Sequence, residues 1–553
     1  MSKLNEITEA IKVQVSTLVA LGRSGVVQPY SPKVLAGLAR VLSQHGVGFA
    51  GGFGAMAMRA PGSTAVIDEL GSLTWGEIDE RTTRLGNALL RNGVHEGDSV
   101  AVLCRNHRGF IDISVALAKV GADILYLNTA FAAPQMGEVC EREKPVAIVY
   151  DEEFTKLVDD SGVDVQRIVA WTDGDAEDVE HPVLEKLIEQ GSTEAVPVPD
   201  HTTAPVILTS GTTGTPKGAP RSEAGMDAAG ALLSKIPLRY GWTCHIAAPL
   251  FHTWGWAHLN LAMLLGTTMV LTRKFDPEHA MELVEEHECD SLVVIPVMLQ
   301  RMMRLDDEVL DAHPMRTLKA VCASGSALPG DFSKAWMDRF GENLYNIYGS
   351  TEVAWATIAT PEDLRTAPGT AGKPPYNTVV KLFDESGEEV PQGEVGRIFV
   401  GNSMLFTGYT GGTEESKEVI DGLMSSGDLG RFDDDGLLHI EGRDDEMIVS
   451  GGENVFPKEV EDTISRHEAV DEVACIGVDD EEFGKRLRAF VVKKGEVDED
   501  TLKKHVKDNL ARYKVPREVV FLDELPRNAT GKILKKDLKE LDENGEQNEE
   551  ASA

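Results

Sequence analysis

The stretch VILTSGTTGTPKG, residues 206–218, joins three apolar residues to a loop rich in glycine and threonine. Glycine lets backbone N–H groups come close to an anion, threonine hydroxyls donate hydrogen bonds, and Lys217 adds a positive charge. This composition suits a polyphosphate. The loop is not a P-loop of the form G-x-x-x-x-G-K-[ST], because Pro216 precedes the lysine and Gly218 follows it. An ordinary flexible surface loop is the alternative interpretation.

On both sides of this loop, strand-like segments alternate with helix-like segments. Ser63–Asp68 and Ser99–Cys104 resemble strands, and Thr74 with Glu77 forms a T-x-x-E capping box that opens a helical pattern. The alternation continues to residue 151 and returns over residues 224–347. This order predicts an α/β fold whose mainly parallel sheets are covered by helices.

The pattern changes near residue 376, where short strands such as Val379–Phe383 lie between glycine and aspartate turns. Such strands favour an antiparallel unit. From Arg443 onward, short strands and helices form a compact α+β unit large enough to fold by itself. We predict an N-terminal helical extension over residues 1–50, a large domain over 51–442, a small C-terminal domain over 443–540 and an acidic tail over 541–553.

Four further segments carry the strongest functional signal. They are LYNIYGSTE (344–352), SSGDL (425–429), EGRDDEMIVSG (441–451) and PRNATGK (526–532). Together with TSGTTGTPKG they resemble, in order, the motifs of the adenylate-forming superfamily of acyl-CoA synthetases, peptide-synthetase adenylation domains and luciferase. The resemblance covers roughly residues 60–540 and is greatest to fatty acyl-CoA synthetases. It implies a large N-terminal domain with a small β-barrel-like part, and a small mobile C-terminal domain.

The resemblance also implies a role for each matched residue. Lys532, Lys217, Glu352 and Thr351 would be catalytic, with Glu352 as the ligand of Mg²⁺. Tyr348 would stack on adenine, and Asp428, supported by Arg443, would accept hydrogen bonds from the ribose. The residues implied to bind ATP or AMP are Thr209, Ser210, Gly211, Thr212, Thr213, Gly214, Gly325, Ser326, Ala327, Tyr348, Gly349, Asp428 and Arg443.

The implied reaction joins a carboxylate to ATP and then transfers the acyl group to CoA, so ATP, Mg²⁺ and CoA are the expected cofactors. Two anions must meet on a chain of net charge −37, which requires local positive charge from Lys217, Lys532 and Mg²⁺. Asp445 stands where the family has its hinge. Gly451 and Gly452 would line the tunnel for CoA.

The segment PLFHTWGWAH, residues 249–258, resembles the aromatic segment before the family's acyl site. His252, Val297 and Ser324 are the predicted acyl-pocket residues, with Gly349 leaving room for a chain. No cation is obvious for a charged substrate tail, which favours a medium- or long-chain aliphatic acid. A zinc site at His252 and His258 is a weaker alternative, because no carboxylate or cysteine joins the two histidines.

Composition excludes several classes of function. A net charge of −37 argues against nucleic-acid binding, and six scattered cysteines argue against disulfides or a zinc finger. No apolar run is long enough to span a bilayer. Ile11, Val15 and Leu18 predict an amphipathic helix, interpreted as packing on the body of the protein, with contact to a membrane surface as the alternative.

We therefore predict a fatty acid–CoA ligase that forms AMP and acts in the cytoplasm, with a peripheral position on the inner membrane surface as an open alternative. Its partners would be small molecules and not nucleic acid. The alternatives are an acyl-AMP ligase that loads a carrier-protein thiol, and a catalytically idle nucleotide-binding relative. The intact set of Lys217, Glu352, Asp428, Arg443 and Lys532 argues against the idle relative.

Overall fold

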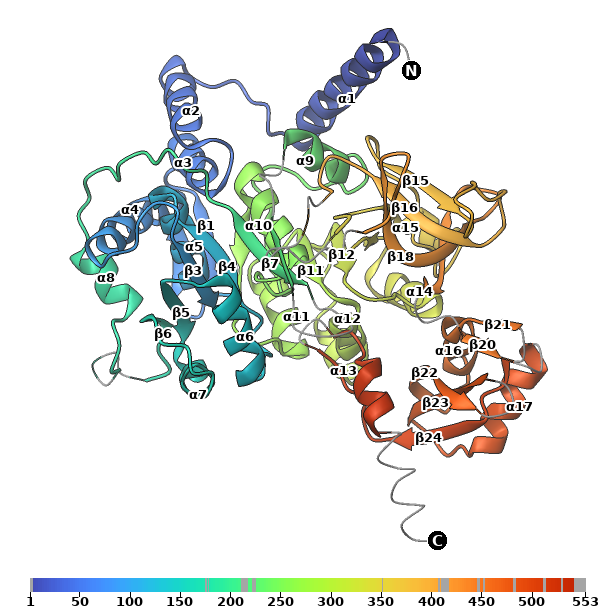
Figure 1. Cartoon of the computed structure of the whole chain (residues 1–553). Coiled ribbons are helices and arrows are strands. Elements are labelled where there is room, and N and C mark those ends of the chain that lie inside the picture. The colour runs from blue at the N-terminus through green and yellow to red at the C-terminus, as the bar shows by residue number, and fades with distance from the viewer. Residues whose placement is uncertain are drawn as a thin grey trace.

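The structure is a computed structural model of the 553-residue chain. It describes residues 3–174, 177, 179–209, 217–220, 225–350, 352–405, 408, 417–444, 448–450, 453–480, 484–510, 514–528 and 531–541. Figure 1 shows two helix-flanked sheets side by side, a third sheet next to them, and a separate C-terminal unit at the edge of the molecule. The α/β class with a large N-terminal and a smaller C-terminal domain is thus confirmed.

The first sheet has six strands in the order β6-β5-β3-β4-β7-β8. All its pairs are parallel except β7–β8, which is an antiparallel hairpin around the glycine–threonine loop. Its strands are β3 (Ser99–Leu103), β4 (Asp123–Tyr126), β5 (Ala147–Asp151), β6 (Gln166–Trp171), β7 (Pro205–Thr209) and β8 (Lys217–Pro220).

The second sheet has eight strands in the order β14-β13-β12-β11-β9-β10-β1-β2, and only its two edge pairs are antiparallel. The central strands of both sheets are therefore parallel, as predicted. The strands are β1 (Thr64–Asp68), β2 (Gly71–Thr74), β9 (Thr243–Ile246), β10 (Thr268–Val270), β11 (Ser291–Val294), β12 (Ala320–Ser324), β13 (Leu344–Tyr348) and β14 (Thr357–Ala359).

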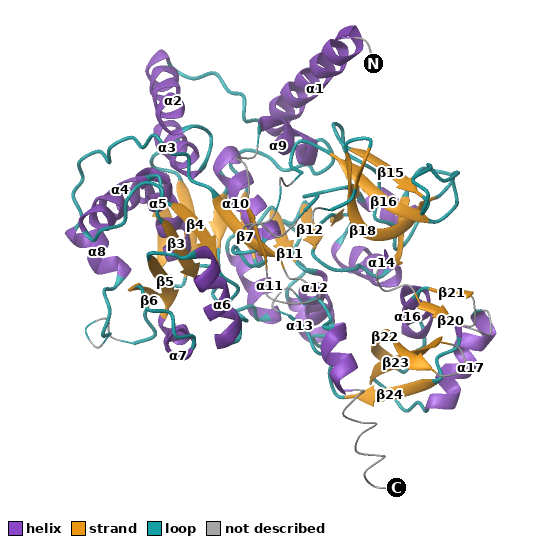
Figure 2. Ribbon diagram, viewed as in Figure 1, coloured by secondary structure: helices purple, strands orange, loops and turns teal. Residues whose placement is uncertain are grey.

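Helices cover the faces of these sheets (Figure 2). The predicted capping box is present: the Glu77 amide donates to Thr74 Oγ1 at 3.2 Å, and the Thr74 amide donates to Glu77 at 2.7 Å. The helices of the large domain after the extension are α4 (Trp75–Arg91), α5 (Arg108–Val120), α6 (Ala133–Glu143), η1 (Glu152–Phe154), α7 (Thr155–Asp160), α8 (Leu184–Gln190), α9 (Met226–Leu233), α10 (Thr253–Leu265), α11 (Pro277–Glu286), α12 (Pro296–Met303), α13 (Asp307–Ala312), α14 (Gly330–Phe340) and α15 (Pro361–Thr366).

The third sheet is antiparallel, as the change of pattern near residue 376 predicts. It consists of β15 (Val379–Phe383), β16 (Gly396–Gly401), β17 (Val419–Ile420), β18 (Leu423–Phe432) and β19 (Leu438–Arg443). The strands after Arg443 belong to other sheets. The domain limits drawn from the sequence stay predictions.

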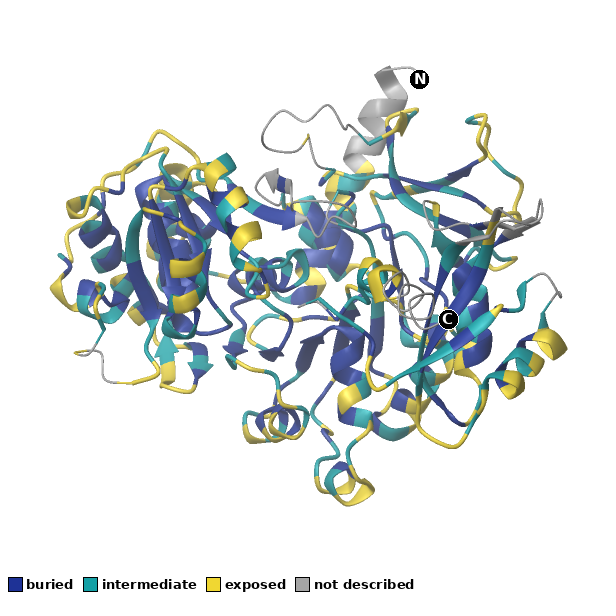
Figure 3. Cartoon of the chain, turned by 60° about the horizontal axis from the view of Figure 1, so that its bottom comes forward, coloured by how far each residue is buried: buried dark blue, intermediate teal, exposed yellow. Residues whose placement is uncertain are grey.

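The described part of the C-terminal unit has a three-stranded sheet, a hairpin, two longer helices and a short helix over residues 535–541, and it has its own apolar core. Its elements are β20 (Ile448–Ser450), β21 (Glu453–Val455), α16 (Pro457–Ser465), β22 (Val470–Asp480), β23 (Gly484–Lys493), α17 (Glu499–Asn509) and β24 (Glu518–Leu522). In Figure 3 the strands and inner helix faces are buried or partly buried, while outer helix faces and turns are exposed.

The extension forms α1 (Lys3–Ser24), α2 (Pro32–His45) and α3 (Phe49–Arg59). Helix α1 packs on α9 through the face that carries Thr17, whose hydroxyl lies 2.9 Å from the Tyr376 hydroxyl. Val15 and Leu18 are 53% and 64% exposed. The helix therefore packs on the body as predicted, but through the face that carries Thr17 and not through Val15 and Leu18. None of the helices, over the residues that the structure describes, is long and apolar enough to cross a membrane.

Candidate active site

A cavity of about 2780 Å³ is lined by the N-terminal extension, the large domain and the C-terminal unit. It collects residues that are far apart in the sequence, from the ends of β12 and β13, from β18, and from the segment after β24. Twelve of the residues predicted to be functional line it: His252, Val297, Ser324, Gly325, Ser326, Ala327, Tyr348, Gly349, Glu352, Asp428, Arg443 and Lys532.

Some predicted site residues cannot be placed. Thr209 and Lys217 are described through their backbone, and they form the register pair nearest the loop in the β7–β8 hairpin. The following predicted residues lie outside the described residues: Ser210, Gly211, Thr212, Thr213, Gly214, Thr351, Asp445, Gly451 and Gly452.

Asp428 is the centre of a buried polar group. The Tyr348 hydroxyl donates to Asp428 Oδ2 at 2.5 Å and lies 3.1 Å from Ser426 Oγ, and Arg443 Nη1 lies 3.4 Å from Asp428 Oδ1. Burial raises the pKa of Asp428, although Tyr348, Arg443 and Lys532 all act to lower that pKa. Burial next to this carboxylate also raises the pKa of Tyr348 well above its usual value. Stacking of Tyr348 on adenine stays a prediction.

Glu352 faces the same cavity and is held by its neighbour. Ser350 Oγ donates to Glu352 Oε2 at 2.8 Å, which fixes one carboxylate oxygen. Carboxylate oxygens are the hard ligands that Mg²⁺ prefers. Glu352 therefore fits the predicted metal role, which remains a prediction.

Two glycines, Gly325 after β12 and Gly349 after β13, are required for different structural reasons. Gly325 has φ = +103°, a conformation that side chains rarely adopt, so glycine is needed after β12. A Cβ at Gly349 would lie 2.1 Å from the Ala354 carbonyl oxygen. Gly349 thus permits the close approach of a neighbouring backbone. That it also leaves room for an acyl chain stays a prediction. Ser324 Oγ donates to the Ile347 carbonyl at 2.9 Å.

Lys532 reaches the cavity on a short turn that touches the large domain. The Lys532 amide donates to Asn528 Oδ1 at 2.9 Å, and a Cβ at Gly531 would lie 2.4 Å from Val297 Cγ1. Gly531 has φ = +74°. The turn therefore needs glycine for both its conformation and its close packing against Val297.

A cluster of ion pairs joins the two parts beside this turn, and sequence reasoning did not identify it. Arg304, just after α12, donates to Asp471 and Glu472 at 2.9 Å each, and Arg527 donates to Glu472 at 2.9 Å. Burial alone would raise the pKa of Glu472, but Arg527 and Arg304 hold it below its usual value. We call Arg304, Asp471, Glu472 and Arg527 the interdomain cluster.

Two histidines lie in the aromatic segment 249–258, and one of them, His252, lines the cavity. Burial lowers the pKa of both His252 and His258 to about 4. His258 Nδ1 donates to the Trp254 carbonyl at 3.2 Å, while His252 Nε2 is buried with no hydrogen-bond partner. In the described part of the chain, neither histidine belongs to a group that could hold a metal ion, so nothing supports the alternative of a zinc site there.

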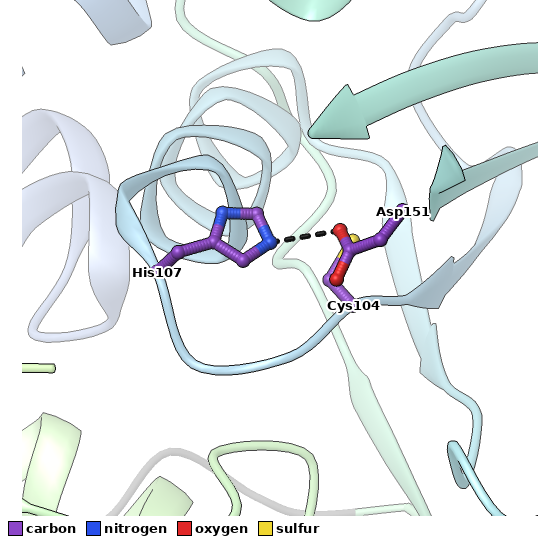
Figure 4. A group of neighbouring side chains, drawn as sticks. All are labelled: Cys104, His107 and Asp151. Carbon is purple, nitrogen blue, oxygen red and sulfur yellow. Dashed lines mark hydrogen bonds and ion pairs between the residues drawn. The ribbon is translucent and has the colours of Figure 1, made fainter. Parts of the chain in front are cut away.

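One buried group elsewhere has the composition of a metal site (Figure 4). His107 Nε2 and Asp151 Oδ1 are 2.8 Å apart, and the Gly109 amide donates to His107 Nδ1 at 3.0 Å. Both ring nitrogens are therefore occupied, and burial raises the pKa of the Cys104 thiol well above its usual value. The group joins the start of α5 to the end of β5, and we interpret it as structural.

The chain matches two family models, described as the AMP-binding enzyme over residues 53–410 and the AMP-binding enzyme C-terminal domain over residues 459–532. The chain belongs to the AMP-binding enzyme family. This confirms the resemblance to the adenylate-forming superfamily.

Curated relatives include a feruloyl-CoA synthase of Amycolatopsis, 32% identical over 87% of this chain and 96% of the relative. A 2-succinylbenzoate–CoA ligase of Geobacillus kaustophilus is 32% identical over 88% and 96%. An indoleacetate–CoA ligase of Aromatoleum aromaticum is 31% identical over 87% and 95%.

Solved structures show the same fold. ATP-bound MatB from Rhodopseudomonas palustris is 27% identical, with a TM-score of 0.76 and coverage of 87% of this chain and 95% of that one. The o-succinylbenzoate CoA synthetase MenE from Bacillus subtilis, in complex with its acyl-adenylate intermediate, is 25% identical, with a TM-score of 0.76 and coverage of 88% and 97%.

Proposed function

We propose that this protein is an ATP-dependent acid–CoA ligase that forms AMP and acts on a medium- or long-chain fatty acid. Acid–CoA ligation through an acyl-adenylate is the part that the family and the relatives support. The single observation that carries the proposal is the shared cavity of twelve separately predicted residues. An idle relative is disfavoured because Glu352, Asp428, Arg443 and Lys532 are all present there.

In the first half-reaction, a carboxylate oxygen attacks the α-phosphorus of ATP, and pyrophosphate leaves. Asp428 accepts hydrogen bonds from the ribose, and the Tyr348 hydroxyl fixes the orientation of that carboxylate. Lys532 stabilises the negative charge that gathers as the new bond forms. Mg²⁺, when held by Glu352, neutralises phosphate charge.

In the second half-reaction, the CoA sulfur attacks the acyl carbon and AMP leaves. We propose that the C-terminal unit rotates about Asp445 between the halves, removing Lys532 and bringing Gly451 and Gly452 to line the CoA tunnel. The C-terminal unit contacts the large domain through the Lys532 turn, the interdomain cluster and the packing of α16 on β19. Such local contacts can break without unfolding either part. A carrier-protein thiol is the alternative acceptor of the acyl group.

The lining of the cavity supports an apolar acid. Ala229, Leu232, Leu261 and Met263 line it together with Trp256. We expect a charged substrate tail to be disfavoured by such a surface. The tryptophan and the substrates named for the relatives favour an aromatic acid as the second candidate. A cytoplasmic location, expected from the cysteines, belongs to this proposal.

The test is pyrophosphate release from ATP and Mg²⁺ over a panel of acids, with and without CoA. Hexanoate to palmitate should outperform benzoate and ferulate, and acyl-CoA should form only when CoA is present. A preference for ferulate would replace the fatty acid by an aromatic one. No pyrophosphate with any acid would contradict the ligase proposal itself.

A further inference from the structure

The start of the chain has a charge opposite to that of the whole protein. Between Glu9 and Asp68 there is no aspartate or glutamate, while the chain as a whole has a net charge of −37. The same stretch contains five basic residues, Lys12, Arg23, Lys33, Arg40 and Arg59. All except Arg59 are exposed.

Large apolar side chains are exposed in the same stretch. Eight of the sixteen exposed large apolar residues in the described part of the chain lie between residues 15 and 58. We call these eight and the four exposed basic residues the N-terminal face. Its members are Val15, Leu18, Val19, Val27, Leu35, Leu42, Val47, Met58, Lys12, Arg23, Lys33 and Arg40.

The position of this face connects it to the active site. Helices α1 and α2 project from one side of the molecule, away from the C-terminal unit (Figure 1). Leu42 and Val47 of the N-terminal face also line the large cavity, as do Val26, Tyr30 and Leu38 of the same extension. Arg59 holds the extension in place, since its guanidinium donates to Tyr30 and to the Leu264 carbonyl. The cavity therefore opens beside the N-terminal face.

We propose that the N-terminal face binds the surface of an anionic lipid bilayer. Exposed apolar residues interspersed with lysine and arginine are the pattern of helices that lie in a membrane interface. The apolar side chains would enter the headgroup region, and the basic side chains would pair with lipid phosphates or carboxylates.

The charge of the remaining chain does not prevent this contact. At physiological ionic strength charges are screened beyond about 8 Å, so the face that touches the bilayer decides the sign of the interaction. A second copy of this chain fits the face less well. A symmetric contact would bring the same cluster of basic residues from both copies together.

If the proposed function holds, membrane contact at the N-terminal face would bring the cavity close to an acid dissolved in the bilayer. An apolar acid dissolved in the bilayer would reach the cavity at Leu42 and Val47 without crossing water. The binding itself can be measured without turnover. A failure of the membrane-binding proposal is therefore distinguishable from a failure of the ligase proposal.

The experiment is flotation of the purified full chain with vesicles of phosphatidylcholine, with and without phosphatidylglycerol. The variant Leu18→Asp/Val19→Asp/Leu35→Asp changes side chains that are 64%, 47% and 52% exposed. Its matched control, Leu70→Asp/Val198→Asp/Val395→Asp, adds the same charge at side chains that are 58%, 46% and 40% exposed elsewhere. Circular dichroism and thermal unfolding establish that both variants fold.

The native chain and the control variant should bind anionic vesicles about tenfold better than neutral ones. The variant Leu18→Asp/Val19→Asp/Leu35→Asp should bind anionic vesicles about tenfold less well than the native chain. Raising the salt to 1 M should weaken the contact. Absence of flotation with anionic vesicles, or equal flotation of both variants, would overturn the proposal. A dimer seen by light scattering and lost only in the first variant would assign the face to a second copy instead.

Discussion

The two walls of the cavity are built differently. On the large-domain side, Asp428 is 13% exposed and is held by a tyrosine hydroxyl and an arginine. On the C-terminal side, Lys532 sits on a turn, and Arg304, the large-domain partner in the ion pairs beside it, is 43% exposed. Buried hydrogen bonds to charged groups contribute more to stability than exposed ion pairs.

This difference suggests a division of labour between the walls. The large-domain wall can hold the nucleotide in one geometry through both half-reactions. In the proposed rotation the C-terminal wall leaves, so whatever Lys532 contributes is available only while the unit is docked. Substitutions on the two walls should therefore have different effects on the two half-reactions.

The largest effect is expected for Lys532→Ala. Removing a charge that stabilises the forming bond should slow adenylation by roughly a thousandfold. Thioester formation from supplied acyl-adenylate should be preserved, because in the proposed rotation the lysine has left before that step. Pyrophosphate release measures the first step, and acyl-CoA formation from synthetic acyl-adenylate measures the second.

Lys536→Ala is the control, since this lysine is 68% exposed and follows on the same segment. It should change neither rate by more than about twofold. If Lys532→Ala slowed both half-reactions equally, the proposal that the C-terminal wall acts only in adenylation would be wrong.

Asp428→Asn tests the fixed wall. Losing a charged acceptor for the ribose should reduce both half-reactions by about a hundredfold. Burial raises the pKa of Asp428. In the native enzyme, kcat/KM for ATP should therefore fall as the pH is lowered, and this fall should begin at a higher pH than it would for an aspartate with an ordinary pKa. The sign follows because the protonated acid, which forms below the pKa, can no longer accept both hydrogen bonds.

The asparagine variant should lack this acidic limb of the pH profile. Tyr348→Phe keeps the ring but removes the donor to Asp428, and it should cost only about tenfold. An unchanged acid limb in Asp428→Asn would assign the titration to another group.

Sequence patterns predicted the parallel core well because local and tertiary preferences agree there. The strand at Thr64–Asp68 and the capping box at Thr74 are examples. The strand β8 was not predicted, because Lys217–Pro220 contains glycine and proline, which isolated strands disfavour. Pairing with β7 overrides that preference.

The site was predictable where it rests on matched motifs and unpredictable where it rests on three-dimensional contacts. Glu352, Asp428 and Lys532 were found from motifs, whereas Arg304 has no motif and pairs with residues more than 160 positions away. Helical periodicity alone could not say which side of α1 faces the body. The contact of Thr17 with Tyr376, a residue far along the chain, decides that.

The smallest effect is expected at the interdomain cluster. Arg304→Glu would replace attraction to Asp471 and Glu472 by repulsion. These pairs are partly exposed, so the docked state should lose about 1 kcal/mol. Adenylation should slow by about fivefold, while thioester formation from supplied acyl-adenylate should stay the same or rise. The loss should also shrink at high salt.

Asp471→Arg added to Arg304→Glu should restore part of the rate, because it returns an opposite charge across the boundary. Arg339→Glu is the matched control: this arginine pairs with Asp307 and Asp311 inside the large domain, so its loss should not separate the half-reactions. If Arg304→Glu and Arg339→Glu behaved alike, the ion pairs beside Lys532 would have no part in docking. The contact of Gly531 with Val297 would then be left as the candidate attachment of the movable wall.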